Sequence, residues 1–282
     1  MGTMPTVPPP MPPANGAPAI SGSGIKKKLG KLSGEFARPR IVLMAVEGWG
    51  KTSYAAHAPD VAIIMARGET GYSTLLSKQR VPNNDAVVVD TWPELLDVLN
   101  DLASGGHGYQ HVALDALGGI ERLCHEFVCA RDFGNDWGEK GFASYAKGYD
   151  VSISEWLKLI SLLDKIHASN TGVIVLSHTL VRTYKNPLGE DFDRYVSDAH
   201  HKTWASTHKW ADAVFFGNFL TIVDKQKGKT GKGIGGTSRV VYTERRDAYD
   251  AKNRYGMPEA IDIPNDPTLV YSVVNQFVVG QQ

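Results

Sequence analysis

Eight consecutive residues, AVEGWGKT at positions 45–52, combine two glycines with a lysine and a hydroxyl side chain. Glycines allow backbone N–H groups to turn inward around an anion, and a helix that begins after them adds its free N–H groups. In such a loop Lys51 would contact the β and γ phosphates of a nucleotide, and Thr52 would bind the accompanying Mg²⁺. The pattern G-x-x-x-x-G-K-S/T has glycine where this chain has Ala45, and an ordinary glycine-rich turn is the alternative.

The neighbours of this loop favour the phosphate-binding interpretation. A β-favouring apolar run at 41–44 precedes the loop, and a helical segment follows it. We therefore expect ATP and Mg²⁺ as ligands. The residues expected around the phosphates are Glu47, Gly48, Trp49, Gly50, Lys51, Thr52 and Ser53.

Two acidic residues follow apolar runs that a sheet would bring to this loop. Asp115 closes HVALD, and an aspartate at the end of such a run binds Mg²⁺ directly or through water. Glu69 follows VAIIMA at 61–66, at the carboxyl end of a buried strand, where ligands bind in open α/β sheets. A motor of the AAA+ kind has its catalytic glutamate directly after this aspartate, but here Ala116 follows Asp115. The catalytic base must therefore lie elsewhere, and we expect Glu69 to activate the attacking water. A solvated turn glutamate is the alternative.

A histidine closes a third apolar run. GVIVLSH at 172–178 is typical of another buried parallel strand, with His178 at its carboxyl end. From that position His178 would sense the γ-phosphate. The alternative is a histidine with a structural role.

The order of the apolar runs predicts the fold class. Strand-like segments at 41–44, 61–66, 86–90, 111–115 and 172–178 alternate with helical patterns, which indicates an α/β fold with a mostly parallel sheet and helices on both faces. ADAVFFGNFLTIVDK and RVVYTER, joined by a flexible basic loop, KQKGKTGKGIGGTS, predict a C-terminal β-hairpin extension.

Composition sets further bounds. Lys plus Arg and Asp plus Glu both number 30, so any nucleic acid would be bound through local patches rather than a global field. Cys124 and Cys129 lie in an apolar helical pattern, which favours buried thiols in a reducing compartment, the cytoplasm. No apolar run approaches the length of a membrane span. Residues 1–35 form a Pro- and Gly-rich tail and basic junction that we expect to be disordered, and 36–282 form one domain.

Residues 179–209 combine basic, aromatic and acidic side chains without a clear period. Lysines and arginines interleaved with aromatic rings suit single-stranded nucleic acid, because rings stack on bases while cations contact phosphates. The lysines of the hairpin tip at 225–232 would add phosphate contacts. A solvated loop is the alternative. His200, His201 and His208 have no recognised metal-ligand spacing.

The order of the motifs also carries a resemblance to a known family. KNRYG at 252–256 resembles the lysine and arginine pair that RecA-class ATPases, including DnaB-type helicases and the RadA branch, insert into a neighbour's nucleotide site. AVEGWGKT, RGET, HVALD, VIVLSH, WADAVFF and AKNRYGMPE, in this order over about residues 38–265, resemble a family of phage-encoded RecA-like P-loop ATPases, some of which act in single-strand annealing recombination.

This resemblance implies a RecA-like fold and an ATPase whose nucleotide site lies between subunits of a homo-oligomer. Lys252 and Arg254 would neutralise transition-state charge in a neighbouring subunit, and a surface turn is the alternative. The resemblance also implies that the protein acts on single-stranded DNA in the cytoplasm of a bacterial host, with phage recombination or replication proteins as possible partners. A ring-forming DNA translocase or helicase and a nucleotide-regulated protein without motor activity are the alternative functions.

Overall fold

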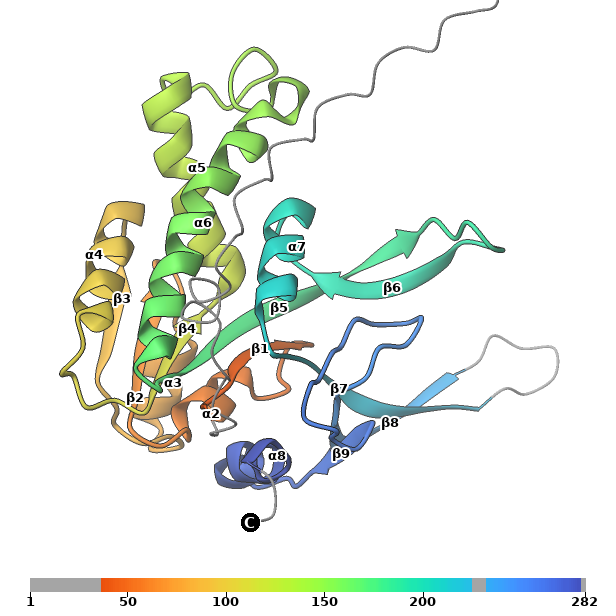
Figure 1. The fold of residues 1–282 in the computed structure, drawn as a ribbon. Helices are drawn as coiled ribbons and strands as arrows, with labels where there is room; N and C mark the ends of the chain where they lie inside the picture. Colours follow the sequence, from red (N-terminus) through yellow and green to blue (C-terminus); the bar gives the residue numbers. More distant parts are fainter. Residues whose placement is uncertain (1–36, 225–231, 280–282) are drawn as a thin grey trace, which may run out of the picture. The chain divides into compact units, whose positions relative to one another are not determined.

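The computed structural model describes residues 37–224 and 232–279, and the tail expected at 1–35 lies outside this range. The described strands form one sheet in the order β3-β2-β4-β5-β1-β7-β8-β9, with β6 pairing only with β5 (Figure 1). The strands are β1 (Arg40–Ala45), β2 (Val61–Ala66), β3 (Ala86–Val89), β4 (His111–Asp115), β5 (Gly172–Tyr184), β6 (Phe192–Ser197), β7 (Ala213–Asp224), β8 (Lys232–Tyr242) and β9 (Ala260–Ile263).

The six strands from β3 to β7 in this order run parallel, and β8 and β9 join antiparallel to them. β5 lies between β1 and β4, so the strand that carries His178 separates β1, which leads into the loop, from β4, which ends in Asp115. The carboxyl ends of parallel strands meet at one edge of a sheet. The fold therefore gathers the ends of β1, β2, β4 and the middle of β5 in one place.

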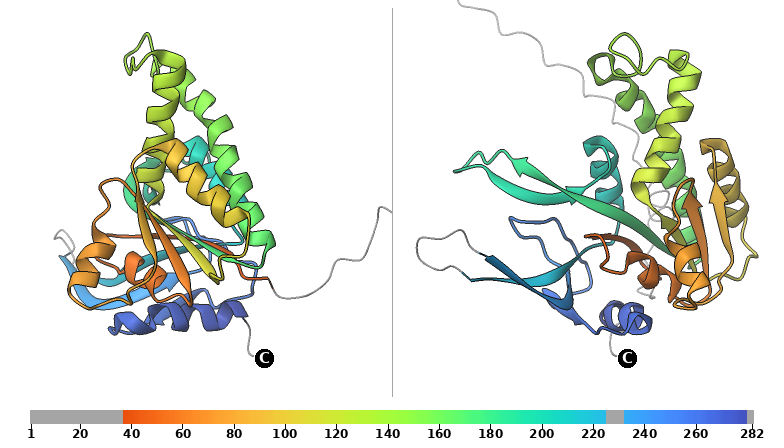
Figure 2. Two further views of the ribbon diagram at one scale, coloured as in Figure 1. Left: turned by 90° about the vertical axis from the view of Figure 1, so that its left-hand side faces the viewer. Right: turned by 180° about the vertical axis from the view of Figure 1, so that it is seen from behind.

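Both faces of the sheet are covered by helices because the buried strands are apolar on both sides. Along β1, Ile41 and Leu43 belong to one apolar cluster and Val42 belongs to the other. α2 (Lys51–Ala56), α3 (Gly71–Ser77) and α8 (Val270–Val279) pack in the first cluster. The second cluster contains α4 (Trp92–Ala103), α5 (Leu117–Phe133), α6 (Lys147–Ala168) and α7 (His201–Trp210) (Figure 2). Two short 3₁₀ turns are η1 (Ser144–Ala146) and η2 (Pro267–Leu269).

Two antiparallel ribbons project from the sheet. β7 and β8 form the expected C-terminal hairpin, although β8 begins at Lys232, inside the stretch predicted to be loop, and residues 225–231 of its tip lie outside the described residues. The second ribbon was not predicted: β5 continues to Tyr184 and pairs with β6, and α7 follows. The buried positions of β6 are the polar residues Arg194 and Ser197, and the end of β5 is exposed, so the sequence of this ribbon lacks the apolar alternation that marks a strand. None of the described helices is both long and apolar enough to cross a membrane.

Candidate nucleotide site

The phosphate-binding loop predicted from the sequence lies between β1 and α2. β1 ends at Ala45 and α2 begins at Lys51, so the loop occupies 46–50. Gly48 and Gly50 have φ angles of 72° and 111°, a region that glycine enters without steric cost. Tyr54 N donates to Gly50 O at 2.9 Å, which closes the first helical turn directly onto the loop. The two glycines therefore make the tight turn for which their residue type was needed.

Trp49 lies in the loop but turns its ring away from the ligand side. The side chain is fully buried, and its Nε1 donates to Val240 O of β8 at 3.1 Å. The ring covers Gly217 of β7 so closely that a Cβ there would lie 2.6 Å from Trp49 Cε2. Among the residues expected around the phosphates, Trp49 thus contributes its backbone, while its side chain anchors the loop to the hairpin.

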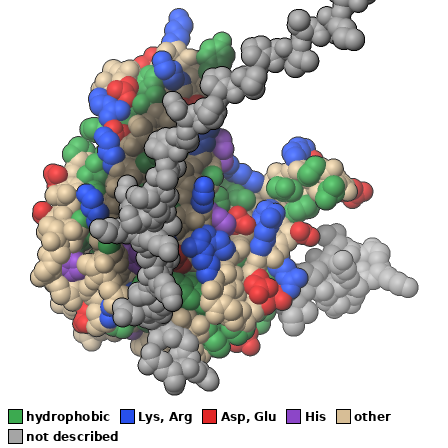
Figure 3. Space-filling model, viewed as in Figure 1, with side chains coloured by type: hydrophobic (Ala, Val, Ile, Leu, Met, Phe, Trp, Pro, Cys, Tyr) green, Lys and Arg blue, Asp and Glu red, His purple; other side chains and the backbone are tan. Residues whose placement is uncertain are grey.

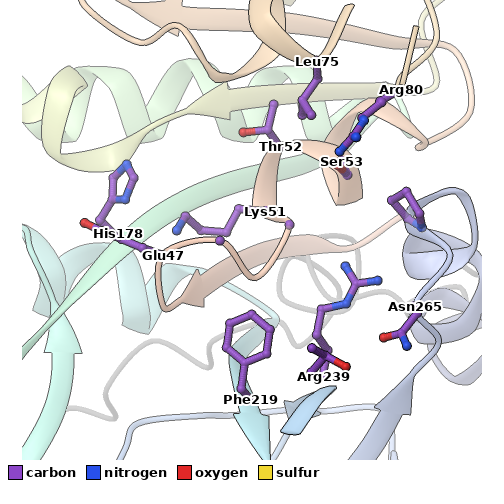
Figure 4. A pocket seen from close by; sticks show the side chains of 14 residues that line it. Glu47, Lys51, Thr52, Ser53, Leu75, Arg80, His178, Phe219, Arg239 and Asn265 are labelled. Atoms are coloured by element: carbon purple, nitrogen blue, oxygen red, sulfur yellow. The ribbon is translucent and has the colours of Figure 1, made fainter. Parts of the chain in front are cut away.

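A cavity of about 780 Å³ opens beside the loop (Figure 4). Its volume is in the range of about 300–1,000 Å³ that is usual for small-molecule sites. The residues that line it are Glu47, Gly48, Gly50, Lys51, Thr52, Ser53, Leu75, Arg80, His178, Phe219, Thr237, Arg239, Asn265 and Pro267. All the residues expected around the phosphates therefore line one cavity, with the exception of Trp49.

Lys51 lies at the centre of the acidic part of the site. Its side chain is only 8% exposed, and Nζ donates to Ala45 O at 3.0 Å, across the loop. Burial lowers the pKa of Lys51, because water no longer stabilises the ammonium. The negative charges that oppose this shift belong to Asp115, Asp198, Glu47 and Glu69. An ammonium held among carboxylates and bound to a single carbonyl has further donors for phosphate oxygens.

Thr52 and Asp115 have the arrangement expected of a magnesium site. Thr52 Oγ1 donates to Asp115 Oδ2 at 3.0 Å. Asp115 is 4% exposed, and burial raises the pKa of its carboxyl group while the hydrogen bond from Thr52 opposes this effect. Within the described residues, no group of three or more His, Cys, Asp or Glu side chains is placed to hold a metal ion. One hydroxyl and one carboxylate nevertheless fit Mg²⁺, which usually keeps several waters and takes its remaining ligands from phosphates.

Glu69 and His178, predicted as base and phosphate sensor, lie beside each other. His178 Nε2 is 4.0 Å from Glu69 Oε1, and both side chains are partly exposed. β5 places His178 directly opposite Ala45, the last residue before the loop. The charge of Glu69 acts on the pKa values of both Lys51 and Asp115. The structure therefore brings together the side chains of Lys51, Glu69, Asp115 and His178.

The structure adds Asp198, which was not predicted. Its N–H donates to His178 O at 3.1 Å, and its Oδ1 accepts from Ser177 Oγ at 3.3 Å. A Cβ at Gly118 would lie 2.3 Å from Asp198 Oδ2, so α5 can approach only because this residue is glycine. Burial raises the pKa of Asp198. No motif surrounds it in the sequence, because it reaches the site only through the fold of β6 back along β5.

Lys252 and Arg254 are outside this cavity. Lys252 Nζ donates to His208 O at 2.7 Å, at the end of α7, and its backbone pairs with Val214. Arg254 forms an ion pair with Asp212 at 3.0 Å, and the same carboxylate also binds Arg40, the first residue of β1. Both residues therefore lie toward the opposite end of β1 from the loop, and the chain does not bring them to its own nucleotide site.

A comparison with protein-family models agrees with this description. Residues 37–255 match the AAA domain family AAA_24. No curated protein matches the sequence significantly. Among solved structures, the chain is similar to the flagellar accessory protein FlaH from Methanocaldococcus jannaschii, with 11% identity, a TM-score of 0.41, and coverage of 86% of this chain and 91% of that one.

A prototypical ATPase from the type III secretion system of pathogenic bacteria is also similar, with 13% identity and a TM-score of 0.39, over 64% of this chain and 52% of that one. Both structural likenesses are distant. The family match spans most of the chain and includes the loop, Asp115 and His178. The chain belongs to the AAA domain family AAA_24 and is a P-loop nucleotide-binding domain of the ATPase type.

Proposed function

We propose that the protein hydrolyses ATP in the presence of Mg²⁺ and couples this reaction to binding of single-stranded DNA as a homo-oligomer. The observation that carries the ATPase part is the hydrogen bond from Thr52 to Asp115, next to the buried Lys51. A hydroxyl, a carboxylate and an ammonium at the end of a glycine turn match the needs of a magnesium-bound triphosphate.

Each side chain of the site has its own role in the proposed reaction. Lys51 neutralises charge on the β and γ phosphates, and Thr52 and Asp115 would hold Mg²⁺, which supplies charge stabilisation for the phosphoryl group. Glu69 accepts a proton from the attacking water. His178 lies 4.0 Å from Glu69 and opposite Ala45, which supports a role as the residue that contacts the γ-phosphate and responds to its presence through β5.

The proposed DNA contact rests on the continuity of β5. The same strand that carries His178 continues as the ribbon with Arg182 and Tyr184, whose side chains are exposed. At about 3.3 Å per residue, Arg182 lies on the order of 13 Å from His178. A cation and a ring at this distance suit a single strand that responds to the nucleotide.

The ribbon is less basic than its sequence suggests. Arg194 is buried and paired with Asp250 at 3.0 Å, and Lys185 is paired with Asp191. Figure 3 shows basic, acidic and hydrophobic side chains interspersed on the projecting ribbon. We therefore expect DNA binding of moderate affinity with only a modest dependence on salt, because few cations remain for phosphate contacts. A role in phage recombination or replication is part of the same proposal and derives from the resemblance of the motifs.

The decisive experiment measures ATP hydrolysis with and without single-stranded DNA while particle size is followed by light scattering. The intact protein should hydrolyse ATP faster with DNA, and Lys51→Ala should abolish hydrolysis in both conditions. Full turnover by Lys51→Ala would refute the ATPase site. A rate that DNA leaves unchanged, together with undetectable DNA binding at low salt, would refute the DNA part alone.

A further inference from the structure

The cavity continues past the loop to a wall built by β7, β8 and the segment after β9. This wall, the β7–β9 wall, consists of Phe219, Arg239, Asn265 and Pro267. Figure 4 shows Phe219 and Arg239 rising from the strands toward the loop, with Asn265 beside Arg239. The phosphate-binding side chains lie at the loop itself, so this wall faces a part of the cavity that a triphosphate alone does not need.

Arg239 is held rigidly in the wall. Its Nη1 donates to Trp49 O at 3.1 Å, and its Nη2 donates to Pro264 O at 2.6 Å. A guanidinium has five N–H groups, so these two bonds leave three for a ligand. Its planar face can also stack on an aromatic ring. A side chain that is already fixed loses little conformational entropy when a ligand binds.

Phe219 and Asn265, which also belong to the β7–β9 wall, have side chains that suit a nucleobase. Phe219 is half-buried and offers an aromatic ring at the cavity surface. Aromatic rings and guanidinium planes are the groups on which nucleobases stack in proteins. The amide of Asn265 can exchange two hydrogen bonds with the N6 and N7 edge of adenine. The wall thus combines stacking surfaces with a polar group that suits adenine.

The wall of the cavity opposite the β7–β9 wall has fewer groups that could bind a base. Leu75 of α3 and Arg80 line it, and Arg80 is exposed. It has no aromatic side chain among its lining residues. A base placed there could stack only on the exposed guanidinium of Arg80, whereas the β7–β9 wall combines a guanidinium fixed by two hydrogen bonds with an aromatic ring, so the β7–β9 wall is the better partner for a flat ring.

We propose that the β7–β9 wall binds the adenine and ribose of ATP and that Arg239 fixes the nucleoside relative to the phosphate-binding loop. This inference rests on the proposed function, because it takes the loop to bind the triphosphate. Arg239 bonds to Trp49 O of that loop, so the same side chain that contacts the nucleoside also holds the loop in place. The hairpin would then be part of the nucleotide site rather than an appendage to it.

Calorimetric binding of Mg²⁺-ATP and of inorganic tripolyphosphate tests this assignment, since the second ligand has the phosphates without the nucleoside. Phe219→Ala and Arg239→Lys should each weaken ATP binding by about fivefold to a hundredfold, the range for loss of one base-stacking contact. Arg239→Lys keeps the positive charge but lacks the planar face. Phe219→Ala should bind tripolyphosphate with unchanged affinity. Arg239→Lys also loses the bond to Trp49 O of the loop, so it should weaken ATP binding more than tripolyphosphate binding.

Leu220→Ala is the matched control, because Leu220 adjoins Phe219 on β7, is 41% exposed and does not line the cavity. It should bind both ligands as the intact protein does. Equal losses for ATP and tripolyphosphate in the two wall variants, or no loss for ATP, would overturn the inference. So would an intact protein that binds ATP no more tightly than tripolyphosphate, although its ATPase site would still stand.

Photo-crosslinking gives an answer that does not depend on variants. The azide of 8-azido-ATP is on the base, so after irradiation the label should lie within 213–220, 236–242 or 260–269. Label on 71–80 would place the base at the opposite wall and overturn the inference. Failure of Lys51→Ala to reduce labelling would instead count against nucleotide binding at the loop, which separates the two proposals.

Discussion

Thr52 Oγ1 donates a hydrogen bond of 3.0 Å to Asp115 Oδ2, which joins two residues 63 positions apart in the chain. The bond links the start of α2 to the end of β4 across the intervening β5. It orients both ligands expected for Mg²⁺ before any ion arrives. Burial makes the charge of Asp115 costly until Mg²⁺ is present, and the bond from Thr52 offsets part of that cost.

Asp115→Asn should remove function and add stability. Hydrolysis should fall by about a hundredfold or more, the scale for loss of one electrostatic contact in a catalytic site. Without ligands, the variant should have a higher Tm at neutral pH, by about 2–4 °C for each 1 kcal/mol of relieved desolvation. Thermal unfolding and ATPase assays of the same preparations would measure both effects.

The Tm difference between Asp115→Asn and the intact protein should depend on pH. Burial raises the folded-state pKa of Asp115 above its ordinary value of 3.8, so the cost of its charge is fully present above the folded pKa. The cost disappears as pH falls through that pKa toward 3.8. The Tm advantage of Asp115→Asn should therefore shrink between pH 7 and about pH 4. Asp97→Asn, at an exposed position of α4, should show no such trend. A constant difference would contradict the assigned cause.

Glu69→Gln should retain ATP binding and lose turnover. An amide keeps the size of the side chain but cannot accept the proton of water, and general-base catalysis contributes about 10²–10⁴-fold. Glu126→Gln is the control, because Glu126 pairs with Arg67 nearby, whereas Glu69 lies 4.0 Å from His178. Equilibrium binding and single-turnover hydrolysis separate the two effects. Loss of ATP binding in Glu69→Gln would mean that Glu69 has a structural role.

Gly217→Ala should disturb the packing of Trp49 and so loosen the phosphate-binding loop. The new methyl would lie 2.6 Å from Trp49 Cε2 and 2.8 Å from Ala45 Cβ, so the ring must move. Forced overpacking of this kind costs about 1–3 kcal/mol. We expect a lower denaturant midpoint and weaker ATP binding in the same variant. At Gly236 a Cβ has its nearest neighbour at 3.8 Å, so Gly236→Ala should leave the midpoint nearly unchanged. Equal midpoints for the two variants would argue against the anchoring role of Trp49.

Local patterns made the centre of the site predictable. The loop, Lys51 and Thr52 are contiguous, and Asp115 and His178 each close an apolar run of the sequence, so the rules for parallel sheets predict that they lie together. The role of the Trp49 side chain was not predictable in this way. Its partner Val240 lies 191 positions away, and nothing near Trp49 in the sequence indicates that its ring turns inward.

Side chains that reach the site through long-range pairing were missed. Asp198 depends on β6 folding back along β5, and Arg239 depends on the register of β8 against β7. The ribbon within 179–209 was missed as well, because the buried positions of β6 are Arg194 and Ser197 rather than apolar side chains. Register between distant strands is set by packing of the whole sheet, which one sequence does not reveal segment by segment.

Arg254 offers a test of the subunit arrangement. Its guanidinium pairs with Asp212, but Asp212 also binds Arg40 at 2.8 Å, so Arg254→Ala leaves that carboxylate paired and the fold intact. Arg254→Ala alone should hydrolyse ATP slowly, because a neighbouring site lacks its cation. Mixed with Lys51→Ala subunits, it should regain part of the rate, since each variant supplies what the other lacks. Arg246→Ala, which removes another exposed pair with Glu259 in the same region, should keep its rate without mixing. Mixed oligomers that form but show no recovery would place Arg254 outside the catalytic reaction, with its ion pair to Asp212 as its whole contribution.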